Sequence, residues 1–420
     1  MAIDNKDKKV LKSSIEREQN EVACSAECEK IKGSKNLNVP HLRFPEFSGE
    51  WEMVSLQDIA TINPKSDPLQ NTFIYIDLEA VEKGELRKIQ EIMREEAPSR
   101  AQRVIDNNDI LFQCVRPYQK NNYIHRILNT SNQQWVASTG YAQIRTTELP
   151  NYIYHLLNTD EFNRKVMVRC TGSSYPAINS EDLATIHLYY TPDKKEQLKI
   201  SRLLDLLDKR IATQNKIIED LNKLKSAIIE MEYTHKTKGN THIGDFIEQT
   251  SKRNKDSAIQ NVLSVSNSQG FIQQCEQFEN RSVASDDISN YKIVERNCFA
   301  FNPARINVGS IARLTTFNRG IVSPMYICFR TKDNLFPEYL DYYFESKQFF
   351  TEIQKRLEGS VRQCLSYEGL CNIPLCIPTV EVQQQTGKRL STLVQEIKLE
   401  IDFLELLQKQ KKFLLHQMFI

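Results

Sequence analysis

Residues 192–221 read PDKKEQLKISRLLDLLDKRIATQNKIIEDL, and this stretch decides the architecture of the chain. After Pro192 there is no glycine or proline as far as Tyr233. Apolar residues, together with one glutamine, recur at alternating spacings of four and three, the pattern of a helix that packs against another helix as a coiled coil. A helix of about 40 residues is roughly 60 Å long, so we expect a spacer rather than part of one small domain. The expected seam residues are Ile200, Leu204, Leu207, Ile211, Gln214, Ile218 and Leu221.

The end of the chain repeats this rhythm. A second helix is predicted from about residue 383 to residue 419, and Gly387 is expected to fray its first turn. Two helices with apolar stripes can bury them against one another, and the chain path between them favours an antiparallel pair. The alternative is that each stripe packs only against its own domain. The expected seam residues of the second helix are Leu390, Val394, Ile397, Ile401 and Leu404.

The two helices belong to a longer internal repeat. A single offset of 187 residues aligns Asp58 with Asp245 and Pro150 with Pro337. The same offset aligns Tyr152 with Tyr339, Gly172 with Gly359, Glu181 with Glu368, Leu183 with Leu370, Leu188 with Leu375, and Met231 with Met418. Each copy begins with predicted strands broken by turns. These strands are residues 73–78, 110–115 and 142–144 in the first copy and residues 299–302 and 325–329 in the second.

Each copy then continues with a short helix and a short strand. The helices are predicted at residues 152–168 and 338–357, each followed by a glycine suited to a turn. The strands, residues 186–192 and 373–378, end at a proline that fits the first turn of the next helix. We therefore predict a mixed α/β (α+β) protein with two tandem domains and two long helices that pair as an antiparallel coiled coil. Its parts are a charged, possibly disordered N-terminal extension (1–40), a first domain (41–190), a central spacer helix (191–235), a second domain (236–378) and a C-terminal spacer helix (379–420).

Composition narrows the class of protein. The 420 residues are 40% hydrophobic and 26% charged, typical of globular proteins, and no apolar run approaches the length of a membrane span. The first 35 residues lack the apolar stretch of a signal peptide, so we expect a cytoplasmic protein. The net charge of +1 does not indicate nucleic-acid binding, so any DNA contact must come from local clusters.

The ten cysteines do not indicate a metal site. No Cys-x-x-Cys pair and no cysteine-histidine cluster at zinc spacing occurs in the sequence. Cys24 and Cys28 could share a helical face, and Cys371 and Cys376 are close in sequence, but neither pair has companions to complete a site. We expect reduced, mostly buried thiols and no bound metal.

The residues at the joints resemble the specificity (S) subunit of type I restriction-modification systems, over nearly the whole chain after residue 40. Residues 42–51 (LRFPEFSGEW) resemble the opening of that family, and residues 109–118 (DILFQCVRPY) its middle strand and loop. The most specific match is residues 192–211, with the proline, Glu-Gln and Leu-Asp steps that start the helix. The second copy departs from this pattern at residues 380–385 (VEVQQQ) and 393–396 (LVQE), where helix packing could differ.

The resemblance implies a division of labour. Each domain would be a target recognition domain that reads one part of a bipartite double-stranded DNA target, while the paired helices fix the distance between them. Two readers on a rigid spacer can address half-sites about one DNA turn, ~34 Å, apart. The resemblance also implies partners: probably two modification subunits that methylate adenine, and restriction subunits that translocate and cut DNA. This chain would be non-catalytic and bind no cofactor, with S-adenosylmethionine, ATP and Mg expected on the partner subunits.

Candidate DNA-binding residues in the first domain lie in two clusters. The loop of residues 116–122 follows an apolar strand and combines basic and amide side chains, which can contact phosphates and base edges. Its candidates are Arg116, Lys120, Asn121 and Asn122. A second cluster, Arg94, Arg100 and Arg103, stands beside Glu91, Glu95 and Glu96, which could neutralise it on a solvated helix.

The second domain offers two further clusters. Lys252, Arg253 and Lys255 suit phosphate binding, although an ordinary solvated loop has the same composition. Arg305, Asn307 and Arg313 occupy the place that corresponds to the loop after Arg116, so we predict the same role for them.

Catalytic alternatives lack their usual parts. The sequence contains no phosphate-binding Gly-x-x-x-x-Gly-Lys-Ser/Thr loop and no Gly-x-Gly-x-x-Gly turn. Residues 302–305 (NPAR) lack the second proline and the aromatic of an adenine-methyltransferase tetrad. For a nuclease, the nearest acidic set is too loosely spaced: Asp77, Glu79, Glu85 and Lys88. The alternative of another class is a coiled-coil scaffold that joins two protein-binding domains without reading DNA, which would expose apolar patches on both domains.

Overall fold

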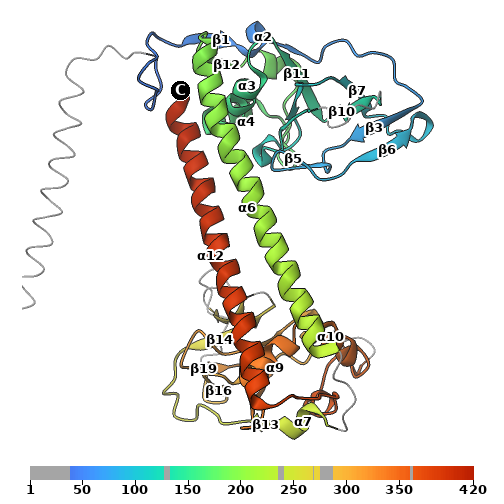
Figure 1. Cartoon of the computed structure of the whole chain (residues 1–420), viewed down its shortest axis with the longest axis vertical. Coiled ribbons are helices and arrows are strands. Elements are labelled where there is room, and N and C mark those ends of the chain that lie inside the picture. Colours follow the sequence, from blue (N-terminus) through green and yellow to red (C-terminus); the bar gives the residue numbers. More distant parts are fainter. Residues whose placement is uncertain (1–37, 127–132, 235–240, 268, 275–286, 360–362) are drawn as a thin grey trace, which may run out of the picture. The chain divides into compact units, whose positions relative to one another are not determined.

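The computed structural model describes residues 38–126, 133–234, 241–267, 269–274, 287–359 and 363–420 (Figure 1). The chain divides into two units, Met1–Ile211 with Leu406–Ile420, and Ala212–Glu405. The extension predicted at residues 1–40 lies, up to residue 37, outside the described residues. Over the described ranges, no helix combines the length and apolarity of a membrane span.

The first unit contains two four-stranded sheets. One has the strand order β6-β3-β10-β7 and the other the order β2-β11-β8-β9. Strands β3 and β10 are parallel, whereas the other neighbours in these sheets are antiparallel. The strands are β2 (Ala60–Ile62), β3 (Thr72–Ile76), β6 (Gln90–Met93), β7 (Ala101–Ile105), β8 (Ile110–Gln113), β9 (Tyr123–Ile124), β10 (Trp135–Ser138) and β11 (Tyr141–Thr146). Two short pairs accompany them: β1 (Glu52–Ser55) with β12 (His187–Tyr190), and β4 (Val81–Glu82) with β5 (Glu85–Leu86).

The second unit contains the same two sheets in the same strand order. They are ordered β15-β14-β19-β16 and β13-β20-β17-β18, and β14 and β19 are parallel, as β3 and β10 are in the first unit. The strands are β13 (Ile247–Thr250), β14 (Val262–Ser266), β15 (Gly270–Gln273), β16 (Lys292–Glu295), β17 (Phe299–Phe301), β18 (Ile311–Arg313), β19 (Arg319–Val322) and β20 (Ile327–Thr331). The predicted internal repeat is therefore confirmed for the eight strands of these two sheets.

The aligned aspartates explain why the offset of 187 residues is kept at the start of each copy. Helix α2 (Leu56–Ile59) and helix α7 (Ile243–Phe246) differ by this offset. The Asp58 carboxylate accepts from the Ser55 amide at 2.7 Å, and the Asp245 carboxylate accepts from the His242 amide at 2.8 Å. Each aspartate thus satisfies a free donor before its helix, which fixes where the chain turns.

The prediction of one short helix at residues 152–168 and one at residues 338–357 is wrong, because each is two helices. In the first unit these are α3 (Pro150–Leu157) and α4 (Asp160–Arg169), and in the second α9 (Pro337–Tyr343) and α10 (Lys347–Gln354). The buried Thr159 hydroxyl accepts from the Phe162 amide, and the buried Ser346 hydroxyl accepts from the Phe349 amide, both at 3.2 Å. Each of these N-cap residues starts a new helix within a continuous run of helical apolar spacing, so the spacing alone suggests one helix.

The short predicted strand forms in only one copy. Strand β12 pairs with β1, but residues 373–378 contribute a single bridge between His242 and Pro374. Pro374 and Pro378 lack the N–H donor that a strand ladder needs, so no strand forms there. The helices before these segments are α5 (Ser180–Ala184) and α11 (Tyr367–Cys371). Gly172 and Gly359 have left-handed φ angles of 89° and 103°, as the predicted turns require.

The two long helices are confirmed as α6 (Lys194–Thr234) and α12 (Val380–Met418) (Figure 1). In the first unit, Asp208 of α6 forms an ion pair of 2.5 Å with Lys411 of α12. In the second unit, the Gln214 amide of α6 donates to the Glu400 carbonyl of α12 at 3.1 Å. Since rising numbers on α6 meet falling numbers on α12, the helices pair in antiparallel fashion.

The predicted seam residues are buried or half-buried on α6, whereas two of those on α12 are exposed. Ile200, Leu204, Leu207 and Gln214 are buried, and Ile211, Ile218 and Leu221 are half-buried. On α12, Leu390 and Ile397 are buried and Leu404 is half-buried. Val394 and Ile401, however, are 37% and 41% exposed, and Leu393 and Glu400 take their places. Glu400 enters the seam because it pairs with Gln214, a choice that a search for apolar spacing alone misses.

Gly387 does not fray the second long helix, which begins seven residues earlier at Val380. A Cβ atom at Gly387 would lie 3.4 Å from the Cβ atom of Glu338 on α9, an ordinary van der Waals contact.

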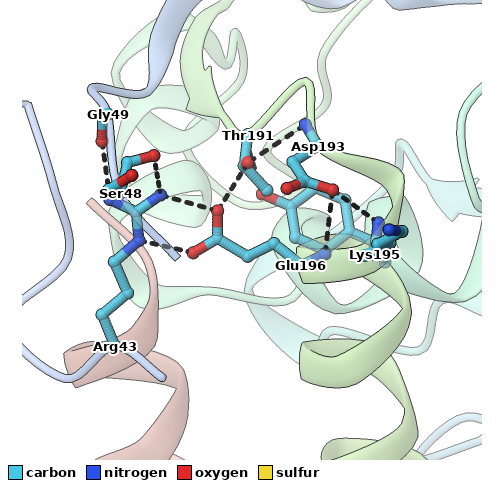
Figure 2. A network of polar contacts seen from close by, with 8 residues as sticks. Arg43, Ser48, Gly49, Thr191, Asp193, Lys195 and Glu196 are labelled. Carbon is cyan, nitrogen blue, oxygen red and sulfur yellow. Dashed lines mark hydrogen bonds and ion pairs between the residues drawn. The ribbon is translucent and has the colours of Figure 1, made fainter. Parts of the chain in front are cut away.

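Residues 42–51 tie the start of α6 and the end of α12 into the first unit. The Arg43 guanidinium donates to both carboxylate oxygens of Glu196, at 2.6 and 2.8 Å, and to the carbonyls of Ser48 and Gly49 (Figure 2). The Leu42 amide donates to the Gln417 carbonyl at 2.8 Å, and the Trp51 ring meets the Phe419 ring edge-on at 6.0 Å. These contacts give the opening motif a structural role.

The long helices α6 and α12 begin with the same hydrogen-bonding arrangement, although their sequences differ there. The Gln197 side chain accepts from the Leu149 amide and donates to the Thr191 carbonyl, at 3.2 and 2.8 Å. The Gln383 side chain accepts from the Phe336 amide and donates to the Pro378 carbonyl, at 2.8 and 2.9 Å. The departure noted at residues 380–385 therefore leaves the joint intact.

Candidate nucleic-acid interface

The loop after β8 borders a cavity of about 840 Å³ in the first unit. The cavity lies where this loop meets the turn between β10 and β11 and the segment after β3. Its lining is mostly polar and charged: Leu78, Glu79, Val81, Glu82, Arg87, Arg100, Gln113, Val115, Arg116, Gln119, Asn121, Thr139, Gly140 and Tyr175. Arg116 and Asn121 among the predicted DNA-binding residues, and Arg100 beside them, are thus brought together.

Backbone geometry holds the loop in an uncommon conformation. A short 3₁₀ turn, η2 (Pro117–Gln119), is flanked by Arg116 and Lys120, whose φ angles of 56° and 52° are left-handed. Non-glycine residues adopt this conformation rarely, and it persists where neighbouring contacts impose it. The Arg116 amide donates to the Pro176 carbonyl at 2.8 Å, and the Gln113 amide donates to the Asn122 side chain at 2.8 Å.

Tyr175 is a site residue that the sequence reading missed. The Arg116 guanidinium stacks over its ring at 4.3 Å from the centroid, and the tyrosine is 63% exposed. The available signal was an aromatic side chain within residues 172–176 (GSSYP), a run of small residues and proline where no core requires it. Its contact with Arg116 depends on two loops distant in sequence.

Two predicted DNA-binding residues of this loop, Asn122 and Lys120, already bond to other residues of the protein. Asn122 is only 2% exposed, and its amide donates to the Asn158 side chain at 3.0 Å, so its role is to hold the loop rather than to contact DNA. Lys120 donates to the Asn158 carbonyl and forms an ion pair of 2.7 Å with Asp160.

The other arginine cluster is divided. Arg94 is exposed at the start of η1 (Arg94–Glu96) and donates to the Leu69 carbonyl at 3.2 Å. Arg103 is half-buried on β7, and burial lowers the pKa of its guanidinium. Its Nε atom is buried and has no hydrogen-bond partner among the residues that the structure describes. Arg103 therefore lies deeper in the unit than an exposed basic cluster predicts.

The second unit has a cavity of about 410 Å³ at the corresponding place, where the loop after β17 meets the turn between β19 and β20. Arg305 borders it and is exposed, just before the 3₁₀ turn η3 (Ile306–Val308) that contains the half-buried Asn307. The buried Oε1 atom of Gln274, another lining residue, lacks a hydrogen-bond partner within the described ranges. The other lining residues are Val262, Leu263, Ser264, Val265, Tyr291, Asn302, Ser310, Ser323, Met325 and Tyr326.

Arg313 does not join this cavity. Its guanidinium forms ion pairs of 3.0 Å with Asp341 and 3.1 Å with Glu338 and donates to the Asn297 side chain. Burial raises the pKa of the Asp341 carboxyl although Arg313 acts in the opposite direction. Arg313 thus ties β18 to α9, and the prediction that it contacts DNA is not supported by its surroundings.

The remaining basic cluster of the second unit is exposed. Lys252, Arg253 and Lys255 are all exposed, and Arg253 donates to the Asn290 side chain at 2.8 Å. Asn254 between them is buried and bonds Ile259 through both ends of its amide. A buried asparagine thus presents three cations on one ordered turn.

The described cysteines are free thiols, and burial raises the pKa of Cys114 and of Cys328 to about 12. At neutral pH such thiols stay protonated and unreactive. Cys24 and Cys28 lie outside the described residues. Within the described ranges, no three His, Cys, Asp or Glu side chains gather as a metal site would require.

Comparison with known proteins finds a family that matches the first copy. Residues 48–223 match the family described as the type I restriction modification DNA specificity domain. The HindI specificity subunit of Haemophilus influenzae, a type I restriction enzyme component, is 23% identical over 189 residues. That match covers 44% of this chain and 37% of the relative, so the chain spans little more than a third of the relative's length. The resemblance predicted from the sequence is confirmed.

Solved structures share the fold along nearly the whole chain. A chain from a structural description of complex assembly and conformational transition of the type I R-M system is 18% identical, with a TM-score of 0.55, covering 90% of this chain and 98% of that one. The S subunit of a type I restriction-modification system from M. genitalium is 14% identical, also with a TM-score of 0.55, covering 91% and 99%. At these identities the likeness establishes the fold: two tandem domains with paired long helices.

Proposed function

We propose, since residues 48–223 belong to the type I restriction modification DNA specificity domain family, that this chain is the specificity subunit of a type I restriction-modification complex. In this role it binds double-stranded DNA and reads a bipartite target. The observation that carries the proposal is the repetition of one sheet arrangement, with an arginine-bordered cavity at the same place in each copy. Two similar readers fit two separate half-sites.

The candidate readers differ between the two copies. In the first unit, Arg100, Arg116, Gln119 and Asn121 border the cavity and can donate to base edges. In the second unit, Arg305 borders the cavity, and Lys252 and Lys255 are exposed cations suited to phosphates.

Partner subunits complete the proposed complex. The modification subunits, two in number, methylate adenine with S-adenosylmethionine, and the restriction subunits use ATP and Mg; this chain is the non-catalytic member and binds none of these cofactors. The complex works where chromosomal DNA is, in the cytoplasm. Exposed apolar residues on the long helices, among them Leu198, Leu206, Leu399, Leu406 and Phe413, give protein partners a surface to bind.

Exposed apolar side chains lie on the domains as well as on the long helices, for example Ile89, Val168 and Met325, so the chemistry of the cavities must decide on the scaffold alternative. A scaffold that joins two protein-binding domains needs apolar patches on the domains themselves. The cavities of both units instead combine arginine with amide side chains, which favours nucleic acid.

Mapping modified adenines in a genome tests the proposal. A host that carries the complete system should show methylated adenines in one bipartite motif, and deletion of the gene for this chain should remove that motif from the map. A map that does not change on deletion would contradict the proposed function.

A further inference from the structure

We infer that Arg116, clamped by Tyr175, reads a guanine in the half-site contacted by the first unit. The inference rests on the proposed function and deepens it, because it assigns one base to one side chain. It starts from the 840 Å³ cavity, which Arg116 and Tyr175 both border.

The Arg116 side chain is held in place and yet free to bind. Its backbone is fixed in the left-handed region by the hydrogen bond from its amide to Pro176, at 2.8 Å. Its Cζ atom lies over the Tyr175 ring, 4.3 Å from the centroid, and a guanidinium held over an aromatic face can still donate from its N–H groups. Among the residues that the structure describes, no carboxylate or carbonyl accepts from this guanidinium. An arginine that is already ordered loses little freedom when it binds.

The surroundings favour a base over a phosphate. Glu79 and Glu82 border the same cavity. Glu82 lies 3.8 Å from Arg87, whereas Glu79 forms no ion pair within the described part of the chain. A carboxylate repels a phosphate, whereas it can accept from the N4 amino group of cytosine. The two parallel N–H groups of a guanidinium match the O6 and N7 acceptors of guanine in the major groove. Among the described residues, the cavity thus offers two guanidinium groups without a carboxylate partner, those of Arg100 and Arg116, and the carboxylate of Glu79. This combination fits a G·C pair, and of the two arginines only Arg116 lies over an aromatic ring.

The test maps modified adenines in a host that lacks this gene and receives the complete system with variants of this chain. Arg116→Ala should relax the motif at one guanine position of one half-site, with a roughly 5- to 150-fold loss of discrimination between bases there, and leave the other half-site unchanged. Tyr175→Leu should relax the same position, whereas Tyr175→Phe, which keeps the stacking ring, should retain the original motif. Arg164→Ala is the charge control, because Arg164 is exposed on α4 and pairs only with Glu161 in its vicinity.

The outcomes separate this inference from the proposed function. If the unchanged gene produces no motif, the proposed function fails. If the motif appears but Arg116→Ala keeps every position while fewer sites are modified, Arg116 contacts a phosphate and the inference is overturned. If Arg116→Ala abolishes all modification, Arg116→Lys and Tyr175→Leu decide: relaxation of one shared guanine supports the inference, and an intact motif in both overturns it.

Discussion

Two buried polar residues, His125 and Glu196, affect the stability of the first unit. The spacing of apolar residues in the sequence does not predict their burial. His125 is fully buried against the Trp135 ring, 4.9 Å away, and neither ring nitrogen has a hydrogen-bond partner in the described part of the chain. Glu196 is also fully buried, and its charge is balanced by Arg43. Burial thus lowers the pKa of His125, whereas Glu196 is held by an ion pair, and the two residues affect stability in different ways.

His125 should make the first unit less stable in mild acid. Desolvation lowers its pKa from 6.5 to about 4, so between these values the unfolded chain takes up a proton that the folded chain refuses. The stabilising contribution is complete above pH 6.5 and is lost as the pH falls toward 4, by about 2 kcal/mol at pH 5. Urea unfolding followed by tryptophan fluorescence at pH 7 and pH 5 measures this loss. His125→Phe, which keeps an aromatic ring beside Trp135, should lose about 2 kcal/mol less over the same interval, and equal losses would refute the assignment.

Arg43→Ala should destabilise the first unit by about 3–5 kcal/mol, because it leaves the buried Glu196 carboxylate without a cation (Figure 2). Lys199→Ala is the matched control: Lys199 pairs with Glu46 at the exposed surface, where solvent screens the pair and the cost should be much smaller. Urea unfolding at pH 7 measures both variants. The double variant Arg43→Met with Glu196→Gln should recover part of the loss, and equal stability of the two single variants would count against a buried charge pair.

Among the elements, the long helices combine an apolar seam with one polar layer. Leu204 and Leu207 of α6 are buried, while Leu206 between them is 59% exposed. Gln214 and Glu400 supply the polar layer, where a leucine pair would also fit the spacing. A polar contact of this kind fixes which residues face each other, since a shifted register would bury both groups without partners.

Leu204→Ala should cost about 2–5 kcal/mol, because it opens a cavity in the cluster where α6 meets Met418 and Phe419. Leu206→Ala removes the same atoms from the exposed face of the same helix turn and should change stability by no more than about 0.5 kcal/mol. Thermal unfolding followed by circular dichroism compares the two. Similar losses in both variants would place the seam on the wrong face of α6.

Taken as a whole, the molecule is one arrangement of strands used twice, with each copy leading into a long helix. The helix connects directly to the domain through a glutamine that bonds both the preceding loop and the proline segment, Gln197 in one copy and Gln383 in the other. Because each long helix is anchored in its domain, the helix length should set the distance between the two domains. The spacer of the bipartite DNA target should therefore depend on that length.

Inserting seven residues after Gln214 and seven after Glu400 should lengthen the spacer of the bipartite target and leave both half-sites unchanged. A heptad preserves the seam and adds about 10 Å of helix, the length of about three base pairs. The map of modified adenines shows the new spacer. Insertion into α6 alone serves as the control, because it puts the seam out of register and should abolish recognition. An unchanged spacer after the double insertion would show that the helices do not set the distance.

Local sequence patterns were sufficient for the architecture. The offset of 187 residues, the helix that follows Pro192 and most strands were predictable, because turn residues, caps and apolar spacing act over a few positions. The family resemblance was equally local, since it lay at the joints of these elements.

Long-range contacts decided what that pattern could not show. The burial of Asn122, the internal pairing of Arg313, the place of Glu400 in the seam and the stacking of Arg116 on Tyr175 each join residues from separate segments. The sequence alone does not reveal whether a polar side chain bonds to water, to protein or to DNA. Only the packed fold determines which polar groups are already satisfied, and therefore which remain free to bind.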